Sequence, residues 1–366
     1  MQIRHILDLI EELAPLSYAA SWDNCGLQVG NPDDPCTGVL VTVNPSLAAI
    51  QHAEHVGANL VIAHHPLLFK ATKRLDTRKD PGRQVAHLAK AGITCYAAHT
   101  NLDATACNHH LAALFGLRMD RVLQVEGRHP WYKLSVLVPV ESERVVLEAL
   151  WQAGAGQTGA YDRVAFLTEG TGTFRPLPGS NPTLGQVGAL HEGRELRIEV
   201  LVPAPVRGAV LAALLKAHPY EAPAYDLIRL ENGGEAYGIG LWGELNEPLS
   251  IEEIARRVQA SISPRSLRLV GDRRRMVRRV GVCSGAGGDL AEAAIAQGVE
   301  LYITGEVRYH TALEAAEQGL AILEAGHQAT EQPVVDYVTN YLAARVPDTL
   351  PIVGFAEPEP FEVLTR

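Results

Sequence analysis

Strands and helices alternate along two stretches of the chain, and this alternation most constrains the fold. In the first stretch we predict strands at 38–43, 59–63 and 93–98 and helices at 46–56, 83–90 and 108–115. In the second we predict strands at 277–283, 300–305 and 320–326, again with helices between them. Such alternation forms right-handed crossovers in a parallel sheet. The sequence therefore predicts an α/β core domain with a largely parallel sheet, made of the N- and C-terminal halves.

The middle of the chain follows a different order. Between residues 128 and 233 the pattern of apolar residues and turns predicts β-α-β-β-α-β, which is the ferredoxin-like arrangement. We therefore predict a core of residues 1–127 and 234–366, interrupted by an inserted ferredoxin-like α+β domain over residues 128–233.

Composition excludes several classes of protein. The net charge of −10 argues against sequence-independent nucleic-acid binding, although the basic run at 271–279 leaves a local patch open. No stretch approaches the roughly 18 consecutive apolar residues of a membrane span. Acidic residues stand in the N-terminal segment where a signal peptide needs an apolar run. The five cysteines form no CxxC pair, so we expect a reduced, cytoplasmic protein.

Side chains that bind metals follow three of the predicted strands. They are His64 and His65, then Asp103, then His327 and Glu331. In an open α/β sheet, ligands bind outside the carboxyl ends of the strands, so we expect all five at one edge of the sheet. If the last helix begins near Thr330, His327 lies on the loop before it and Glu331 in its first turn.

Five such residues exceed the needs of one catalytic zinc, which takes three protein ligands and a water. With a bridging carboxylate they suit two divalent ions about 3.5–4 Å apart, as in two-metal hydrolytic sites. Imidazole and carboxylate ligands suit Zn, Fe, Mn or Ni, so the identity of the metal stays open. Each piece also has a structural explanation: the histidine pair can serve the fold, and His327 and Glu331 can form a helix cap with an acidic first turn. Asp103 can be an ordinary turn or N-cap residue.

Several ordered segments carry a family resemblance. "WDNCGLQVG", "IAHHPLLF", "AAHTNLD", "YITGEVRYH" and "GHQATE" resemble the GTP cyclohydrolase 1 type 2 homologue family, whose members are hexameric proteins with a dinuclear metal centre. The region containing "AHPYEAPAYDL" resembles the PII/CutA-like module of the longer members. The resemblance implies two divalent metal ions as cofactors, a homohexamer, and five metal ligands, with Glu331 as the bridging carboxylate. The ligands are His64, His65, Asp103, His327 and Glu331.

The chain departs from the family pattern at three places. Glu306 stands where the family usually has aspartate, and "ATACNHH" follows "HTNLD" in place of a Gly-Val-Asn run. Gln328 stands where an aromatic residue is common. These departures concern ligand orientation and substrate contacts rather than the metal ligands themselves.

Other residues near the same strand ends could have either a functional or a structural role. His99 could orient a ligand or substrate, or could simply be satisfied by the backbone. His310 could transfer a proton. Trp22 could stack on a planar base or anchor its loop. The "SGAGG" turn at 284–288 resembles a phosphate cradle, but no Walker-type lysine follows it. The segment 218–225 could line a second pocket or pack the inserted module.

Two functions from different classes follow. The first is a metal-dependent hydrolase acting on a small molecule. A nucleotide such as GTP is the candidate substrate that the family name suggests, and its purine ring opens after attack at C8 while an acid protonates the departing nitrogen. His310, His99 and Glu306 are the candidate catalytic acids, and a phosphoester or another cyclic amidine is an alternative substrate. The second is a non-enzymatic toroidal metal-binding scaffold with a regulatory or metal-handling role. A hydrolase needs an open coordination position and a cleft, whereas a structural site is closed.

Overall fold

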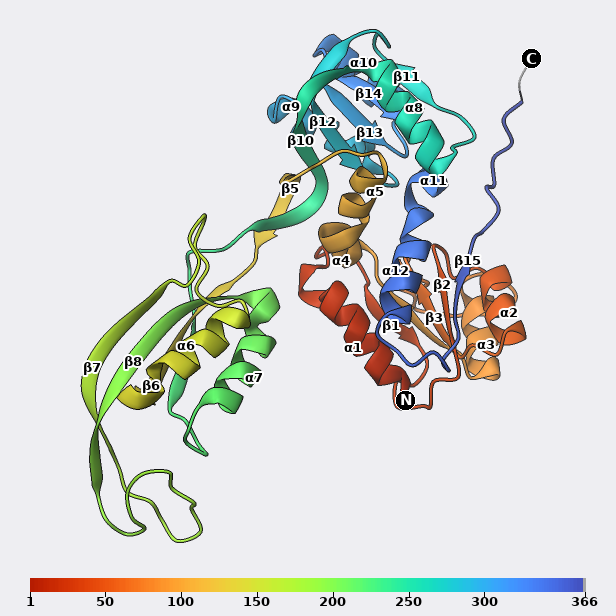
Figure 1. Ribbon diagram of the computed structural model, residues 1–366. Coiled ribbons are helices and arrows are strands. Elements are labelled where there is room, and N and C mark those ends of the chain that lie inside the picture. The colour runs from red at the N-terminus through yellow and green to blue at the C-terminus, as the bar shows by residue number, and fades with distance from the viewer. Residues whose placement is uncertain (365–366) are drawn as a thin grey trace. The chain divides into compact units, whose positions relative to one another are not determined.

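The computed structural model describes residues 1–364, and the chain forms two compact units. The core unit comprises Met1–Gly127 together with the chain from Tyr237 onward. The middle unit comprises Arg128–Ala236. Figure 1 shows their helices and strands. No helix within residues 1–364 combines the length and the apolar character that crossing a membrane requires.

The first sheet of the core unit has five strands. In spatial order they are β1 (Gly26–Val29), β4 (Thr94–Ala97), β3 (Leu60–Ala63), β2 (Val39–Thr42) and β15 (Ile352–Phe355). Four are parallel, and β1 pairs with β4 in the antiparallel sense. Buried residues pack one face against α1 (Ile3–Leu13) and α12 (Pro333–Ala343), and the other against α2 (Leu47–His55) and α3 (Gly82–Ala91). The central strands are apolar on both faces because helices cover both.

The second sheet of the core unit has six strands. They are β11 (Arg268–Val270), β14 (Ala321–Glu324), β13 (Leu301–Thr304), β12 (Met276–Cys283), β10 (Ala236–Ser250) and β5 (Arg121–Arg128). The three strands β12, β13 and β14 are parallel. One face packs against α5 (Asn108–Leu114) and α8 (Ile251–Ile262), and the other against α9 (Ala291–Ala296) and α10 (Tyr309–Glu317).

The mixed α/β class is confirmed, but the prediction of one sheet for the core is wrong. The first block has the antiparallel strand β1 at one edge and its own parallel strand β15 at the other, and the antiparallel strands β11 and β10 flank the second block. The two blocks lie in two separate sheets. The strand-end residues of the two halves come from two sheets rather than from one edge.

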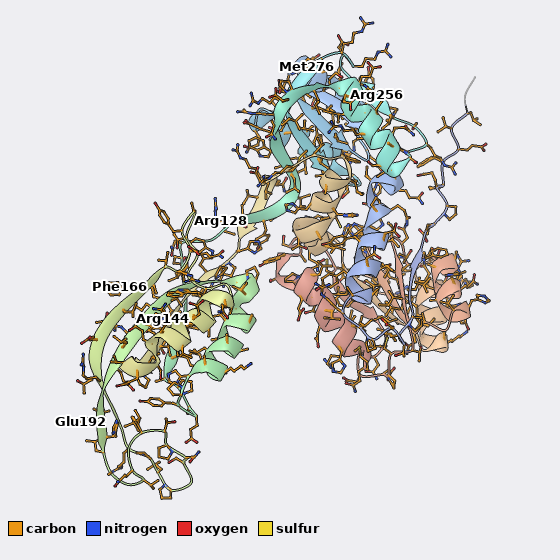
Figure 2. All side chains as sticks on the ribbon, in the orientation of Figure 1. Arg128, Arg144, Phe166, Glu192, Arg256 and Met276 are labelled. Carbon is orange, nitrogen blue, oxygen red and sulfur yellow. The ribbon has the colours of Figure 1, made fainter. Side chains whose placement is uncertain are left out.

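The middle unit has one antiparallel sheet. Its elements in chain order are β6 (Trp131–Pro139), α6 (Glu143–Gln152), β7 (Ala165–Phe174), β8 (His191–Pro203), α7 (Arg207–Ala217) and β9 (Tyr225–Arg229). The strands lie in the order β7-β8-β6-β9, and every pair is antiparallel. Both helices pack on one face, where they bury Leu134, Val136 and Ile198. Phe166 points from β7 to the face without helices and is exposed (Figure 2).

Candidate metal centre

His64 and His65 follow directly after β3. Their backbone N–H groups donate to Thr42 and Val43 of the neighbouring strand, so the parallel ladder continues through both residues. The Nδ1 atom of His64 lies 2.9 Å from the carbonyl oxygen of Ala98. Because a carbonyl only accepts, Nδ1 carries the proton, and the Nε2 atom of the buried ring keeps a free lone pair.

Asn44 fixes His65 in the same way. Its Oδ1 atom lies 2.8 Å from Nδ1 of His65, and its Nδ2 donates to a carboxylate oxygen of Glu357 at 2.7 Å. Since the carboxylate only accepts, the amide can point only its oxygen at the ring, which leaves Nε2 of His65 with a lone pair. Gln328 donates to the Glu357 carbonyl and so helps to hold this C-terminal segment in place.

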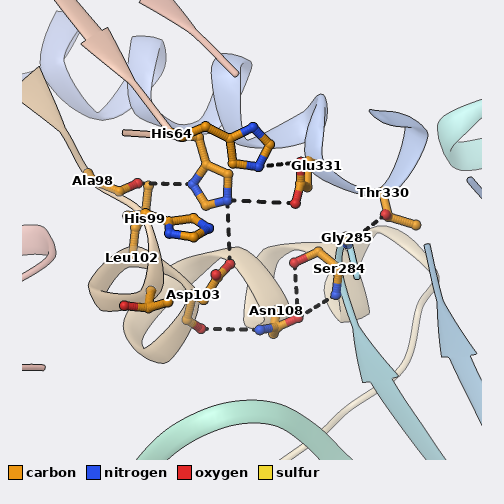
Figure 3. Close-up of polar contacts among 12 residues, drawn as sticks. His64, Ala98, His99, Leu102, Asp103, Asn108, Ser284, Gly285, Thr330 and Glu331 are labelled. Atoms are coloured by element: carbon orange, nitrogen blue, oxygen red, sulfur yellow. Dashed lines mark hydrogen bonds and ion pairs between the residues drawn. The ribbon is translucent and has the colours of Figure 1, made fainter. Parts of the chain in front are cut away.

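Asp103 comes from the helical segment after β4. The segment contains a π-helical turn over Asp103–Cys107, a feature that is frequent at functional sites. The Oδ1 atom of Asp103 lies 3.7 Å from Nε2 of His64. Nδ2 of Asn108 donates to the carbonyl of Asp103, while its Oδ1 accepts from the backbone N–H and hydroxyl of Ser284 (Figure 3). Asn108 thus links the π turn to the end of β12.

His327 and Glu331 come from the second sheet. The prediction of a helix start near Thr330 is wrong: helix α11 spans His327–Glu331, because Gly326 with φ 89° turns the chain out of the strand one residue earlier. Both side chains therefore stand one helical turn apart on one face, with Nε2 of His327 3.0 Å from Oε1 of Glu331.

Glu331 connects the histidines that follow β3 with His327 of α11. Its Oε2 lies 3.2 Å from Nε2 of His65, and its Oε1 lies 3.9 Å from Nε2 of His64 (Figure 3). Oδ1 of Asp103 and Oε2 of Glu331 are buried and accept no hydrogen bond of good geometry. Buried carboxylate oxygens without donors, facing imidazole lone pairs, form a donor set that fits divalent cations.

The "SGAGG" turn closes around the carboxylate. Gly285 has φ 62°, and a Cβ atom there would lie 2.1 Å from Oε1 of Glu331 and 3.3 Å from Nε2 of His327. Its N–H donates to the hydroxyl of Thr330 at 3.0 Å. Only glycine fits this position, and its role here is to let the turn approach Glu331.

The charges of the group are coupled. Burial lowers the pKa of His64. Burial alone would raise the pKa of Glu331, but its close contacts with His327 and His65 outweigh it and hold this pKa far below its ordinary range. Burial alone would lower the pKa of His327, but its bonds to Glu331 and Glu306 raise it to about 9. Oε1 of Glu306 lies 2.5 Å from Nδ1 of His327, so Glu306 orients this ring.

His99 lies beside the group. One ring nitrogen each of His64, His65 and His99 lie within 4.8 Å of one another. The Nδ1 atom of His99 donates to the buried carboxylate of Asp23, at 3.0 Å from both oxygens. Burial alone would lower the pKa of His99, but this bond and the nearby carboxylates raise it. Thr100 also donates to Asp23, through its N–H and its hydroxyl.

Two further predicted residues lie at different places. The ring of His310 on α10 is exposed and lies next to Tyr309, with 5.4 Å between the ring centroids. Within residues 1–364, no contact joins it to the five candidate metal ligands. Trp22 is 59% exposed and lies 6.3 Å from the His99 ring and 6.1 Å from the ring of exposed Phe69. These two aromatic rings border the group on the His99 side.

A cavity of about 480 Å³ borders the group on the His327 side. Gly305, Glu306, Val307 and His327 line it together with Phe361 of the C-terminal segment. Its volume falls in the range of small-molecule sites, roughly 300–1,000 Å³. The group therefore adjoins space that a substrate of nucleotide size could enter.

Sequence reasoning assigned no role to four residues in or beside the group: Asn44 and Cys107 lie against candidate ligands, Asp23 contacts His99, and Glu357 contacts Asn44. Asn44 follows the end of β2, so the rule that placed the histidines at strand ends could have found it. The Cys107 sulfur lies close to His64 and Asp103, but burial raises the pKa of this thiol well above its ordinary value. Cys107 is therefore a neutral thiol in the metal-free chain, beside two of the five predicted ligands.

Comparison with protein families agrees with this geometry. A family model described as Duf34/NIF3 (NGG1p interacting factor 3) matches residues 1–360. A protein of Halalkalibacterium halodurans named "GTP cyclohydrolase 1 type 2 homolog" is 36% identical over 361 residues, which cover 97% of each chain. A Bacillus subtilis protein of the same name is 37% identical over 347 residues, covering 94% of this chain and 93% of its own.

A solved structure is similar over the whole chain. The crystal structure of a Bacillus cereus protein related to NIF3 superimposes with a TM-score of 0.83 at 34% identity, covering 100% of this chain and 99% of the other. The similarity extends through both units.

Proposed function

The chain belongs to the Duf34/NIF3 family, and on this premise we propose that it is a metal-dependent hydrolase holding two divalent ions. His64, His65, Asp103, His327 and Glu331 would be the ligands, with Glu331 shared by both ions. One observation carries the proposal: Oδ1 of Asp103 and Oε2 of Glu331 are buried without a hydrogen bond and lie near Nε2 of His64 and His65, while Oε1 of Glu331 lies 3.0 Å from Nε2 of His327.

The donor set suits Zn, Fe, Mn or Ni. Divalent ions held there would polarise the bond under attack and activate water at neutral pH. The protein's part is orientation: Ala98, Asn44 and Glu306 each fix one imidazole so that its Nε2 faces the centre. The cavity beside His327 favours a hydrolase over a closed structural site.

The name of the relatives leads us to propose a nucleotide substrate whose purine ring is opened. Trp22 and Phe69 would stack on the base beside the centre. His99 is the preferred catalytic acid, because its Nδ1 is anchored on Asp23 and its ring lies 5.2 Å from the His64 ring and 5.3 Å from the His65 ring. In the reaction water adds at C8, the C8–N bond breaks to leave a formyl group on the other nitrogen, His99 gives the departing nitrogen its proton, and the proton that the added water loses restores His99. Glu306 contacts Nδ1 of His327, which favours a role in orienting that ring. Within residues 1–364, His310 has no contact with the candidate ligands.

The remaining expectations extend the proposal. We propose that the protein is a cytoplasmic homohexamer and that the middle unit is an inserted ferredoxin-like, PII/CutA-like domain. The observed order of elements in Arg128–Ala236 supports the second statement, and the five free cysteines agree with a reducing compartment. Light scattering at micromolar concentration tests the hexamer, which a monomer would contradict.

Turnover of nucleotides, phosphoesters and cyclic amides by protein reloaded with each metal tests the central proposal. Asp103→Ala and His327→Ala should lose metal and activity together. His99→Gln should keep its metal but lose roughly 10²–10⁴ in rate, as expected for a general acid. Glu317→Gln, on the exposed end of α10, is the matched control. If fully metallated protein turns over none of these substrates, the non-enzymatic metal-binding scaffold becomes the better description.

A further inference from the structure

The middle unit contains a cavity of its own, about 250 Å³ in volume. Its walls come from β6, β7, β8, the loop after β7 and the segment after α7. The lining is mainly apolar and includes Leu137, Phe174, Pro176, Pro182, Glu195 and Tyr220. None of these residues belongs to the core unit, so the cavity is separate from the candidate metal centre.

One buried carboxylate faces this apolar space. Glu195 is only 8% exposed, and the hydroxyl of Tyr220 donates to its Oε1 at 3.0 Å. In the part of the chain that the structure describes, its Oε2 receives no hydrogen bond from the protein and no ion pair reaches the side chain, and this oxygen is accessible from the cavity rather than fully enclosed. A Cβ atom at Gly172 would lie 2.0 Å from Oε2, so the glycine makes room for the carboxylate.

The charge of the cavity has one sign. Glu195 and Glu221 are carboxylates, and the lining contains no lysine, arginine or histidine. The rings of Phe174 and Tyr220 lie 5.6 Å apart and offer faces and edges to a ligand. A buried carboxylate without a cation costs free energy, and aromatic faces attract cations.

The loop that closes the cavity is tied in place. The hydroxyl of Thr183 donates to the carbonyl of Pro219 at 2.6 Å, and the N–H of Asn181 donates to the carboxylate of Glu221 at 3.2 Å. These bonds join the loop after β7 to the segment after α7. The cavity is therefore formed before any ligand enters, which lowers the entropic cost of binding.

We propose that this cavity binds a small organic cation, a primary ammonium or guanidinium group on a short hydrocarbon chain. The cationic head would bind Oε2 of Glu195, and the hydrocarbon would lie against Leu137, Pro176 and Pro182. The volume lies below the roughly 300–1,000 Å³ of drug-sized sites, which restricts the ligand to a few carbon atoms. A metal ion fits less well, because among residues 1–364 Glu195 belongs to no group of three metal-type side chains.

Calorimetric titration of the full chain with n-butylammonium and n-butylguanidinium tests the proposal, with butyrate and 1-butanol as matched controls. We expect the two cations to bind in the millimolar range or tighter and the controls not to bind. Glu195→Gln keeps the shape and should weaken cation binding at least tenfold. Glu199→Gln should leave it unchanged, since Glu199 lies on the same strand but pairs with Lys133 and Arg197.

Three results would overturn the proposal: no cation binding, equal binding of butyrate or butanol, or equal cation affinity in folded Glu195→Gln. Circular dichroism checks the fold of each variant. If Glu195→Gln does not fold, Phe174→Leu decides, because it alters the wall without touching the carboxylate. Loss of the aromatic face should weaken ammonium binding roughly two- to fivefold. Unchanged affinity in that variant would place the cation elsewhere.

Discussion

Glu331 in the core unit and Glu195 in the middle unit are both buried carboxylates, with 6% and 8% of their surface exposed. Glu331 is surrounded by three imidazoles whose Nε2 atoms face its oxygens. Glu195 has one tyrosine hydroxyl and an apolar wall. The comparison teaches that a buried acid does not by itself define a site. Its neighbours decide whether it suits a divalent metal, which needs several lone pairs, or an organic cation, which needs apolar surface.

The substitution Glu331→Gln should separate the two carboxylates most strongly. We expect the affinity for metal to fall more than a hundredfold, because substituting even the residues that only orient the ligands lowers it about 10–100-fold. Elemental analysis and competition with a chelator measure the effect. Glu195→Gln is the matched control and should keep the full metal content. Equal metal content in both variants would contradict the role of Glu331 as the shared ligand.

Asn44→Ala should have the next largest effect on metal. Without Oδ1 of Asn44, the His65 ring can rotate or change its tautomer, so affinity should fall about 10–100-fold. Glu357→Gln should lower the metal affinity less, because the amide oxygen of the new side chain can still accept the hydrogen bond from Asn44. Chelator competition measures both, with Glu359→Gln as a control on the same segment. Unchanged affinity in Asn44→Ala would show that His65 is held by its backbone alone.

The strand ends could be predicted from sequence, because short β-branched runs followed by polar residues mark them locally. Predicted 59–63 and 93–98 became Leu60–Ala63 and Thr94–Ala97. Which sheet each strand joins could not be predicted, since flanking strands such as β15 come from far along the chain. The Asn44–Glu357 bond was out of reach for the same reason: 313 positions separate the partners.

Stability of the metal-free protein should also separate the two carboxylates. Glu331→Gln loses the ion pair with protonated His327, so we expect the free energy of unfolding to fall by about 1–3 kcal/mol. Glu195→Gln removes a buried charge that has no cationic partner, so we expect no loss, or a gain of up to about 1 kcal/mol. Urea unfolding in the presence of a chelator measures both. A similar loss in the two variants would mean that Glu195 is stabilised by its surroundings as well as Glu331 is.

A pH dependence of stability is also expected from the core unit. The pKa of His327 is raised to about 9 in the folded, metal-free chain, above its ordinary value of 6.5. A raised pKa means that the protonated ring stabilises the fold fully below pH 6.5, and that this contribution is lost as pH rises through about 9. The urea midpoint of metal-free protein should therefore fall between these values, and less so in His327→Asn. Bound metal requires the neutral ring, so the loaded protein should not show this fall. An equal slope in metal-free wild type and His327→Asn would assign the pH dependence to other groups.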